Sequence, residues 1–195
     1  MPDPTSRRDR PGFPAAPAAG LRETVHATCV VVGAAGVLIR GESRAGKSSL
    51  ALALIELCTL QGGFAALVGD DRVRVEARHG HVVARPHPAI AGLIEVRGHG
   101  IVAIDHVPAC ILRLVVDLVA PGPRLPEPQE PEVAIVGVAL PFLRIDRAAR
   151  NVGLAPGLVL AKLLAATPSV SSQSHTPPRC GEAPAPRSAG AAGVA

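Results

Sequence analysis

Hydrophobic residues along the chain follow two patterns, and both lie between residues 21 and 166. Short apolar runs rich in β-branched residues and bounded by glycine or proline are typical of strands. Two longer stretches, 49–60 and 158–166, have the leucine-rich character of helices, and leucines in the first recur on one helix face. The runs predict strands at 28–32, 37–40, 64–68, 101–104, 111–119 and 133–138, and a hairpin over 72–84 that turns at His79-Gly80.

The order of these elements predicts the fold class. One helix follows a strand and a loop, and then several strands come nearly in succession. This order favours an α/β domain with a mixed β-sheet over regular βαβ alternation. Outside the domain, residues 1–20 predict a disordered N-terminal lead and residues 167–195 a low-complexity disordered tail, because both are rich in small residues and proline and lack periodicity. The domain is therefore expected over 21–166.

Composition excludes several classes of protein. The net charge is only +4, and the chain has no Trp, no Tyr and three Phe, so a nucleic-acid module that stacks bases on aromatic rings is not expected. No apolar run reaches the roughly 18–20 residues that span a bilayer. The four cysteines are far apart in the sequence, which argues against a disulfide framework or zinc site. These features predict a reduced, cytoplasmic protein without nucleic-acid or membrane partners.

The strongest chemical signal is a glycine-containing loop between the first strands and the first helix. It matches G-x-x-x-x-G-K-[ST] and follows an apolar strand, as a phosphate loop does. Glycines allow backbone N–H groups to turn toward phosphate oxygens, the lysine reaches the terminal phosphates, and the hydroxyl binds Mg²⁺. The predicted nucleotide-binding residues are Gly41, Glu42, Ser43, Arg44, Ala45, Gly46, Lys47 and Ser48.

Carboxylates near this loop are the candidate catalytic groups. Asp70 and Asp71 end the apolar run that follows the helix. Neighbouring carboxylates push their pKa values apart, which suits one of them to act as a base. Asp117 also ends an apolar run, but an outward-facing strand residue is the simpler interpretation. Glu95 lies in the string Ile94-Glu-Val-Arg-Gly-His-Gly-Ile101, for which a bulged strand with an ion pair is the alternative to a functional loop.

Four segments together resemble the HPr kinase/phosphorylases, and more narrowly a short form with only the C-terminal catalytic domain. They are His26 at 21 residues before the loop lysine, the loop with its helix, Val68-Gly-Asp-Asp71, and the string 94–101. The resemblance covers about residues 24–147. It implies a P-loop kinase fold, ATP and Mg²⁺ as cofactors, and a serine of the phosphocarrier protein HPr as acceptor. It also implies phosphorolysis in reverse, regulation of the phosphotransferase system, and a homo-oligomer, commonly a hexamer.

The resemblance also implies roles for individual residues. Ser48 and Glu95 would bind the metal, whereas general phosphate-loop chemistry would give that task to one acid of the 70–71 pair. Asp71 would take the proton from the acceptor serine, with Asp70 beside it and His26 in support. The predicted catalytic residues are His26, Lys47, Asp70, Asp71, Arg97 and Arg124.

The sequence departs from the family pattern at a few positions. Arg44 stands where members often have glycine, and Ser49 where they often have glutamate. Two other functions therefore stay open. One is a non-catalytic module that binds ATP and a partner, and the other is a phosphate-loop kinase that acts on a small molecule.

Overall fold

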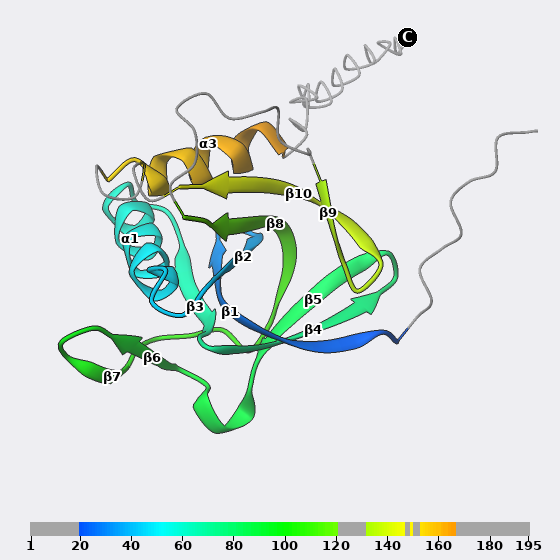
Figure 1. The fold of residues 1–195 in the computed structure, drawn as a ribbon, viewed down its shortest axis with the longest axis horizontal. Helices are drawn as coiled ribbons and strands as arrows, with labels where there is room; N and C mark the ends of the chain where they lie inside the picture. The colour runs from blue at the N-terminus through cyan, green and yellow to red at the C-terminus, as the bar shows by residue number, and fades with distance from the viewer. Residues whose placement is uncertain (1–19, 121–131, 147–148, 150–152, 167–195) are drawn as a thin grey trace, which may run out of the picture.

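The computed structural model describes residues 20–120, 132–146, 149 and 153–166. Its elements are β1 (Arg22–Val32), β2 (Ala35–Gly41), α1 (Lys47–Leu60), β3 (Ala65–Gly69), β4 (Arg72–Arg78), β5 (His81–Pro86), the 3-10 turn η1 (Pro88–Ile90), β6 (Leu93–Val96), β7 (Gly100–Ala103), β8 (Cys110–Leu118), β9 (Glu132–Ile135), β10 (Val138–Ile145) and α3 (Ala155–Ala166). Figure 1 shows their arrangement.

In the described part of the chain, eight strands form one strongly curved sheet. The strand order is β2-β1-β4-β5-β8-β10-β9, with β3 paired to β1. Strand β8 also pairs with β2, so the row of strands returns on itself. The pairs β2–β8 and β8–β10 are parallel, and the pairs β1–β2, β1–β4 and β4–β5 are antiparallel. The predicted α/β domain with a mixed sheet is therefore confirmed.

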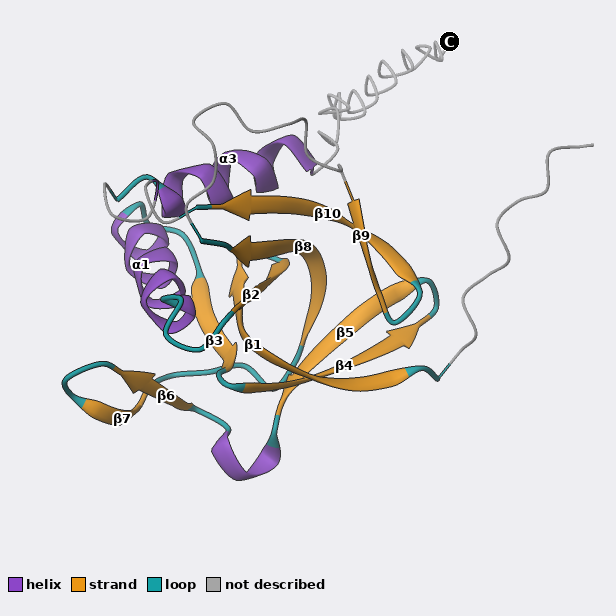
Figure 2. Cartoon of the chain, viewed as in Figure 1, coloured by secondary structure: helices purple, strands orange, loops and turns teal. Residues whose placement is uncertain are grey.

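Both helices lie on the same side of the sheet, over β2, β3, β8 and β10 (Figure 2). Successive side chains of β2 pack alternately into the hydrophobic clusters on the two faces of the sheet. Val37 and Ile39 pack with Leu54 of α1 and Val159 of α3, whereas Leu38 packs into the cluster on the opposite face. Successive side chains of a strand point to opposite faces, so a strand buried on both faces reads as a continuous apolar run.

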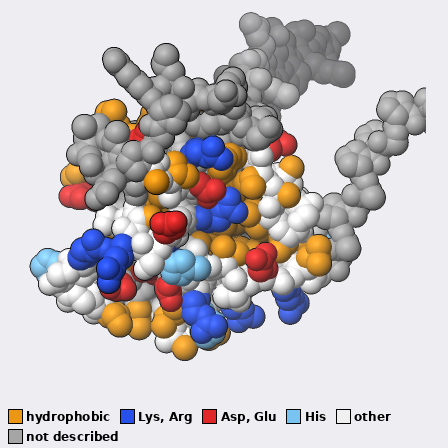
Figure 3. Space-filling model, viewed as in Figure 1, with side chains coloured by type: hydrophobic (Ala, Val, Ile, Leu, Met, Phe, Trp, Pro, Cys, Tyr) orange, Lys and Arg blue, Asp and Glu red, His pale blue; other side chains and the backbone are white. Residues whose placement is uncertain are grey.

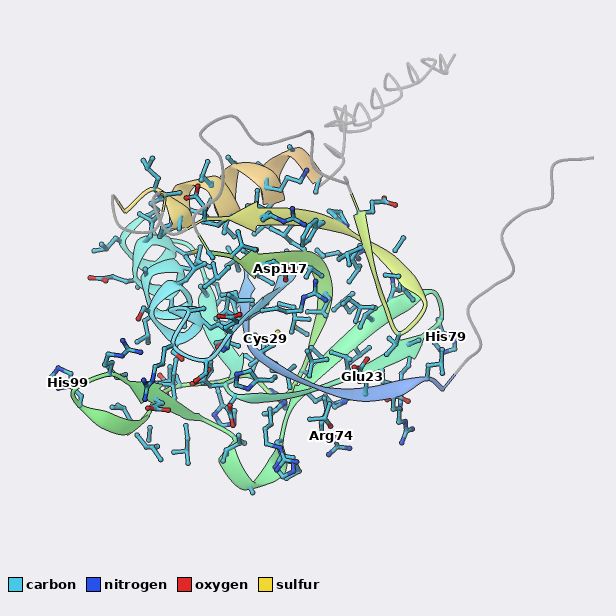
Figure 4. All side chains as sticks on the ribbon, in the orientation of Figure 1. Glu23, Cys29, Arg74, His79, His99 and Asp117 are labelled. Atoms are coloured by element: carbon cyan, nitrogen blue, oxygen red, sulfur yellow. The ribbon has the colours of Figure 1, made fainter. Side chains whose placement is uncertain are left out.

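One strand prediction is wrong, and one alternative that the sequence left open is excluded. The run 133–138 is not one strand, because Val136 and Gly137 both have positive φ and form the turn between β9 and β10. The string 94–101 is not a bulged strand, because β6 and β7 pair as a separate two-stranded sheet around the turn that contains Gly98. This hairpin projects from the body, and Figure 4 labels His99 at its tip.

The remaining elements agree with the pattern to within a few residues, apart from β1, which begins at Arg22 rather than at 28. The hairpin β4–β5 turns at His79 and Gly80, with φ of 48° and 76°, as the two-residue turns of hairpins require. Cys29, Cys58 and Cys110 are buried and form no disulfide with one another. No described helix combines the length and the apolar character that a bilayer crossing requires.

Candidate active site

The predicted phosphate loop connects β2 directly to α1. Gly46 stands at the N-cap of α1 with φ of 92°, and Gly41 has φ of 148° at the end of β2. A Cβ on Gly41 would lie 2.8 Å from the backbone oxygen of Leu118, so a side chain there would push the loop away from β8. Arg44 has φ of 65°, a left-handed conformation that glycine adopts without strain.

The Lys47 side chain points into the loop rather than into solvent. Its ammonium donates to the backbone oxygens of Gly41 and Glu42, both at 3.1 Å, and lies 3.0 Å from Nε2 of His26. The residue is 8% exposed. Burial lowers the pKa of Lys47 from its ordinary value, and the charges of Asp70 and Asp71 oppose this change. The lysine thus holds the loop closed from within.

Asp70 joins four elements at the end of β3. Its carboxylate accepts hydrogen bonds from the Thr28 hydroxyl at 2.5 Å, the Ser48 hydroxyl at 3.1 Å and the Glu95 backbone N–H at 3.1 Å. Thr28, Lys47 and Asp70 are the buried polar side chains of the described residues. Buried charges require such partners, so the interior polarity of this domain is concentrated at the loop.

Asp71 and His26 form a second, exposed pair beside Asp70. His26 Nδ1 lies 2.9 Å from Asp71 Oδ1, and the two side chains are 54% and 62% exposed. Because the Lys47 ammonium can only donate, Nε2 of a neutral His26 accepts and Nδ1 carries the proton toward Asp71. His26 therefore connects the loop lysine to the exposed carboxylate.

An open pocket of about 1040 Å³ adjoins the loop, and neither His26 nor Asp71 lines it. Residues 40–46 line it, together with Ser49 of α1, Arg97 of the β6–β7 hairpin and the N-terminal end of α3. Arg40 and Asp117 also line it, and they form a two-point ion pair across the parallel strands β2 and β8 at 2.7 and 2.8 Å. The pocket has the size of a site for a small molecule.

The donor set beside the loop fits a magnesium ion. Among the described residues, no three His, Cys, Asp or Glu side chains gather as a metal cage. Ser48 and Asp70 instead offer a hydroxyl and a carboxylate in contact with each other. Mg²⁺ binds through one or two protein oxygens and completes its shell with water and phosphate.

The structure brings most of the predicted site residues together. His26, Lys47, Ser48, Asp70 and Asp71 form one connected group. The loop residues 41–46 and Arg97 line the adjacent pocket. The Glu95 side chain is exposed, and the contact that Glu95 makes with the group is its backbone N–H on Asp70. Arg124 lies outside the described residues.

Two contributions were not anticipated from the sequence. Thr28 is fully buried and donates to Asp70, although in the sequence it is one β-branched residue in a strand. Asp117 is more than an outward-facing strand residue, since it is paired with Arg40 at the pocket. A polar residue within an otherwise apolar run was the available signal in both cases.

Comparison with known proteins points to the same family as the sequence motifs. Residues 19–109 match the family model described as HPr Serine kinase C-terminal domain. Proteins named HPr kinase/phosphorylase are 40% identical over 76 residues in Mycoplasma mycoides and 33% identical over 147 residues in Streptococcus thermophilus. The matches cover 39% and 68% of this chain, but only 22% and 45% of those relatives, so the chain spans less than half of their length.

A solved structure extends the match to the fold. The Hpr(Ser) kinase/phosphatase from Coxiella burnetii superposes with a TM-score of 0.59 at 28% identity, over 73% of this chain and 97% of that one. The matched region 19–109 contains the loop, the Asp70-Asp71 pair, His26 and the β6–β7 hairpin. The chain thus belongs to the HPr kinase/phosphorylase family, through the C-terminal domain of its longer members.

Proposed function

We propose that this chain is a Mg²⁺-dependent serine kinase that transfers the γ-phosphoryl group of ATP to a serine of an HPr-type phosphocarrier protein. The observation that carries the proposal is the contact of buried Asp70 with Ser48 of the loop, beside the exposed pair His26–Asp71. One carboxylate faces the phosphate loop and the next faces solvent. A kinase for a protein acceptor needs both arrangements.

The donor side would be the loop and its pocket. Backbone N–H groups of residues 42–46 and the N-terminus of α1 provide positive dipoles for phosphate oxygens. The Lys47 ammonium already lies inside the loop, where it donates to two backbone carbonyl oxygens. When a nucleotide binds, the ammonium would exchange these contacts for contacts with the β- and γ-phosphates. Arg97 lines the same pocket and would add positive charge where negative charge develops in the transfer.

The metal side would be formed by Ser48, with Asp70 next to it and Glu95 as the further predicted ligand. Mg²⁺ bound there would neutralise charge on the phosphates. Asp70 fits this task because its carboxylate is fixed by three donors. This role for Asp70 follows general phosphate-loop chemistry and adds to the assignment of Glu95 that the family resemblance implies.

The acceptor side would be Asp71. As the serine oxygen attacks the γ-phosphorus, the bond to the β–γ bridging oxygen breaks and the hydroxyl proton passes to the Asp71 carboxylate. His26 donates to Asp71 Oδ1, which orients the carboxylate and leaves Oδ2 for the proton. In the reverse direction, inorganic phosphate attacks the phosphoserine, pyrophosphate forms, and the same carboxyl returns the proton to the serine oxygen.

Intact-mass spectrometry of HPr from the same organism tests this function. HPr is incubated with the protein, ATP and Mg²⁺, and a matched reaction contains the Lys47→Met variant. The expected result is a gain of one phosphate with the wild type and none with the variant. ATP binding without any mass gain would contradict the proposal and favour a nucleotide-binding module. ATP turnover with no protein acceptor would contradict it and favour a small-molecule kinase.

A further inference from the structure

A basic surface covers the outer face of the sheet formed by β1, β4 and β5. Residues paired across antiparallel strands point to the same face, and here Arg22 pairs with Glu76, Thr24 with Arg74, and Arg74 with Arg85. Val73, Val75 and Ala77 alternate with them and are buried in the core. We call this the arginine face; it consists of Arg22, Thr24, Arg72, Arg74, Glu76, Arg78 and Arg85, together with Glu23, which pairs with Val75 but lines the same hollow.

The arginine face has an excess of positive charge. Its five arginines and two glutamates leave a net charge of +3, against +4 for the whole chain. Glu76 forms ion pairs with Arg22 and Arg78 at 2.9 Å each. The hydrogen bond from Arg78 is the main reason that the pKa of Glu76 is lowered. Figure 3 shows Lys and Arg side chains along the edge of the body where Figure 4 labels Arg74.

Three of the arginines have no partner within the described chain. Arg72, Arg74 and Arg85 are exposed, and no described residue forms an ion pair or hydrogen bond with their guanidinium groups. A shallow hollow of about 400 Å³ lies among the side chains of this face, with Arg74 and Arg85 on its wall. These three groups are available to bind an anionic surface.

The arginine face begins at the proposed proton acceptor. His26 pairs with Arg72 across β1 and β4, and Arg72 directly follows Asp71. From that row to the row of Arg22 and Glu76 the strands run four residues, or about 13 Å. A protein that presents its serine to Asp71 would therefore cover these rows, since a standard interface buries about 800 Å² on each partner.

The pocket that would bind the nucleotide leaves His26 and Asp71 free for the acceptor, since neither residue lines it. Its lining is formed by the loop, α1, β8, α3 and Arg97, and it shares no residue with the hollow on the arginine face. Donor and acceptor must meet at the phosphate in line from opposite sides. The acceptor therefore approaches from the side on which His26 and Asp71 are exposed.

We propose that the arginine face is the docking surface for the protein acceptor, and that Arg72, Arg74 and Arg85 bind acidic residues that surround its serine. The proposal rests on the proposed kinase function. A protein occupant is favoured over a nucleic acid, because glutamates are interspersed among the arginines and the chain has no Trp or Tyr to stack on bases.

Steady-state kinetics with HPr as the probe tests this surface. We expect Arg74→Glu to raise KM for HPr about tenfold and to flatten its rise with salt, because a repulsion that salt screens replaces an attraction that salt screens. KM for ATP and kcat should stay within about twofold. The matched control is Lys162→Glu on α3, which changes the net charge equally on the helical side and should leave KM for HPr unchanged. Arg74→Lys should restore most of the affinity.

The outcomes separate this inference from the proposed function. If the wild type phosphorylates HPr and Arg74→Glu and Arg85→Glu both leave KM for HPr unchanged, the docking surface is wrong and the kinase function stands. If the wild type phosphorylates nothing, the kinase function is wrong, and calorimetric titration with HPr decides the surface. Binding that Arg74→Glu weakens about tenfold supports it, whereas equal binding by both proteins, or none, overturns it.

Discussion

Asp70 and Asp71 are neighbours in the sequence with the same side chain, yet they belong to different environments. Asp70 is 6% exposed and its carboxylate has three hydrogen-bond donors from other elements. The Asp71 side chain is 62% exposed and contacts His26. In the proposed reaction one dipeptide would serve two sides, with a fixed carboxylate on the donor side and an accessible one on the acceptor side.

The backbone between the two residues causes this difference. Asp71 has φ of 62°, and the backbone N–H of Arg72 donates to the backbone carbonyl oxygen of Asp70 at 2.7 Å. A hydrogen bond between residues two apart defines the tightest kind of turn. This turn reverses the chain between β3 and β4, so consecutive side chains diverge. Aspartate is among the residues that tolerate a positive φ.

The largest expected effect comes from Asp71→Asn. An amide cannot take the serine proton, so kcat for HPr phosphorylation should fall roughly 10²–10⁴-fold, the usual contribution of a general base. Because the side chain is exposed, the free energy of unfolding and KM for ATP should change little. Single-turnover phosphoryl transfer measures the loss of rate, urea unfolding measures the free energy of unfolding, and steady-state kinetics measure KM for ATP. A variant that retains wild-type turnover would remove Asp71 from the acceptor side.

The same substitution at the neighbouring position should act on folding and on the donor side. In Asp70→Asn, the hydroxyls of Thr28 and Ser48 can turn to accept from the new amide, but the negative charge that strengthens all three hydrogen bonds is lost. A hydrogen bond to a charged group contributes about 1 kcal/mol more than one to a neutral group. We expect the free energy of unfolding to fall by this amount and Mg²⁺-dependent ATP affinity to weaken. Unchanged urea midpoints would show that Asp70 does not support the buried cluster.

Arg44→Gly should sharpen the comparison, because Arg44 lies on the donor side only. Its φ of 65° strains an L-residue by about 1 kcal/mol, and glycine removes that strain. The pocket also loses a guanidinium group that lines it. We expect equal or slightly higher stability in thermal unfolding, a KM for ATP raised a few-fold, and an unchanged KM for HPr. A larger effect on HPr than on ATP would contradict the division into two sides.

The smallest expected effect is a pH dependence from Lys47, which lies between the two sides. Burial lowers the pKa of Lys47, so in the folded protein the amine loses its proton at lower pH than in the unfolded chain, where the ordinary value is 10.5. Between those two values the unfolded chain binds more protons, and stability rises with pH. Relative to Lys47→Met, the wild type should therefore gain stability as pH approaches 10.5.

Urea unfolding of both proteins between pH 8 and 10.5 measures this difference. Burial raises the pKa of Cys29, so this thiol lowers stability in alkali. That contribution is present in both proteins and cancels when they are compared. Parallel curves for the wild type and the variant would show that the folded structure does not change the titration of Lys47.

The fold class and the loop could be predicted because both are local in the sequence. Glycine spacing, an apolar strand and a following helix lie within about thirty residues, and backbone geometry follows from them. The turn at Val136-Gly137 was missed because the apolar residues on both sides form one continuous run. The contact of Thr28 with Asp70 was missed because it depends on the pairing of β1 with β3, which the local pattern does not specify.

The division between the acids was only partly visible for the same reason. The pair itself was recognised, and Asp71 was identified as the candidate base. That Asp70 lies against Ser48 depends on where the end of β3 lies relative to the start of α1. The resemblance to the family emphasised Glu95, whereas the contacts of this chain place Asp70 beside Ser48, the proposed metal ligand.

The three donors of Asp70 also determine when during folding the chain acquires its site. They are separated from Asp70 by 42, 22 and 25 residues in the sequence. Contacts between distant residues form late, since loop closure must be paid before they stabilise anything. During synthesis the cluster cannot form until residue 95 has left the ribosome, and a collapsed intermediate that lacks the β6 strand would leave the Asp70 carboxylate with two of its three donors. The full set of contacts around Asp70 therefore forms only after β1, α1 and β6 have all come together.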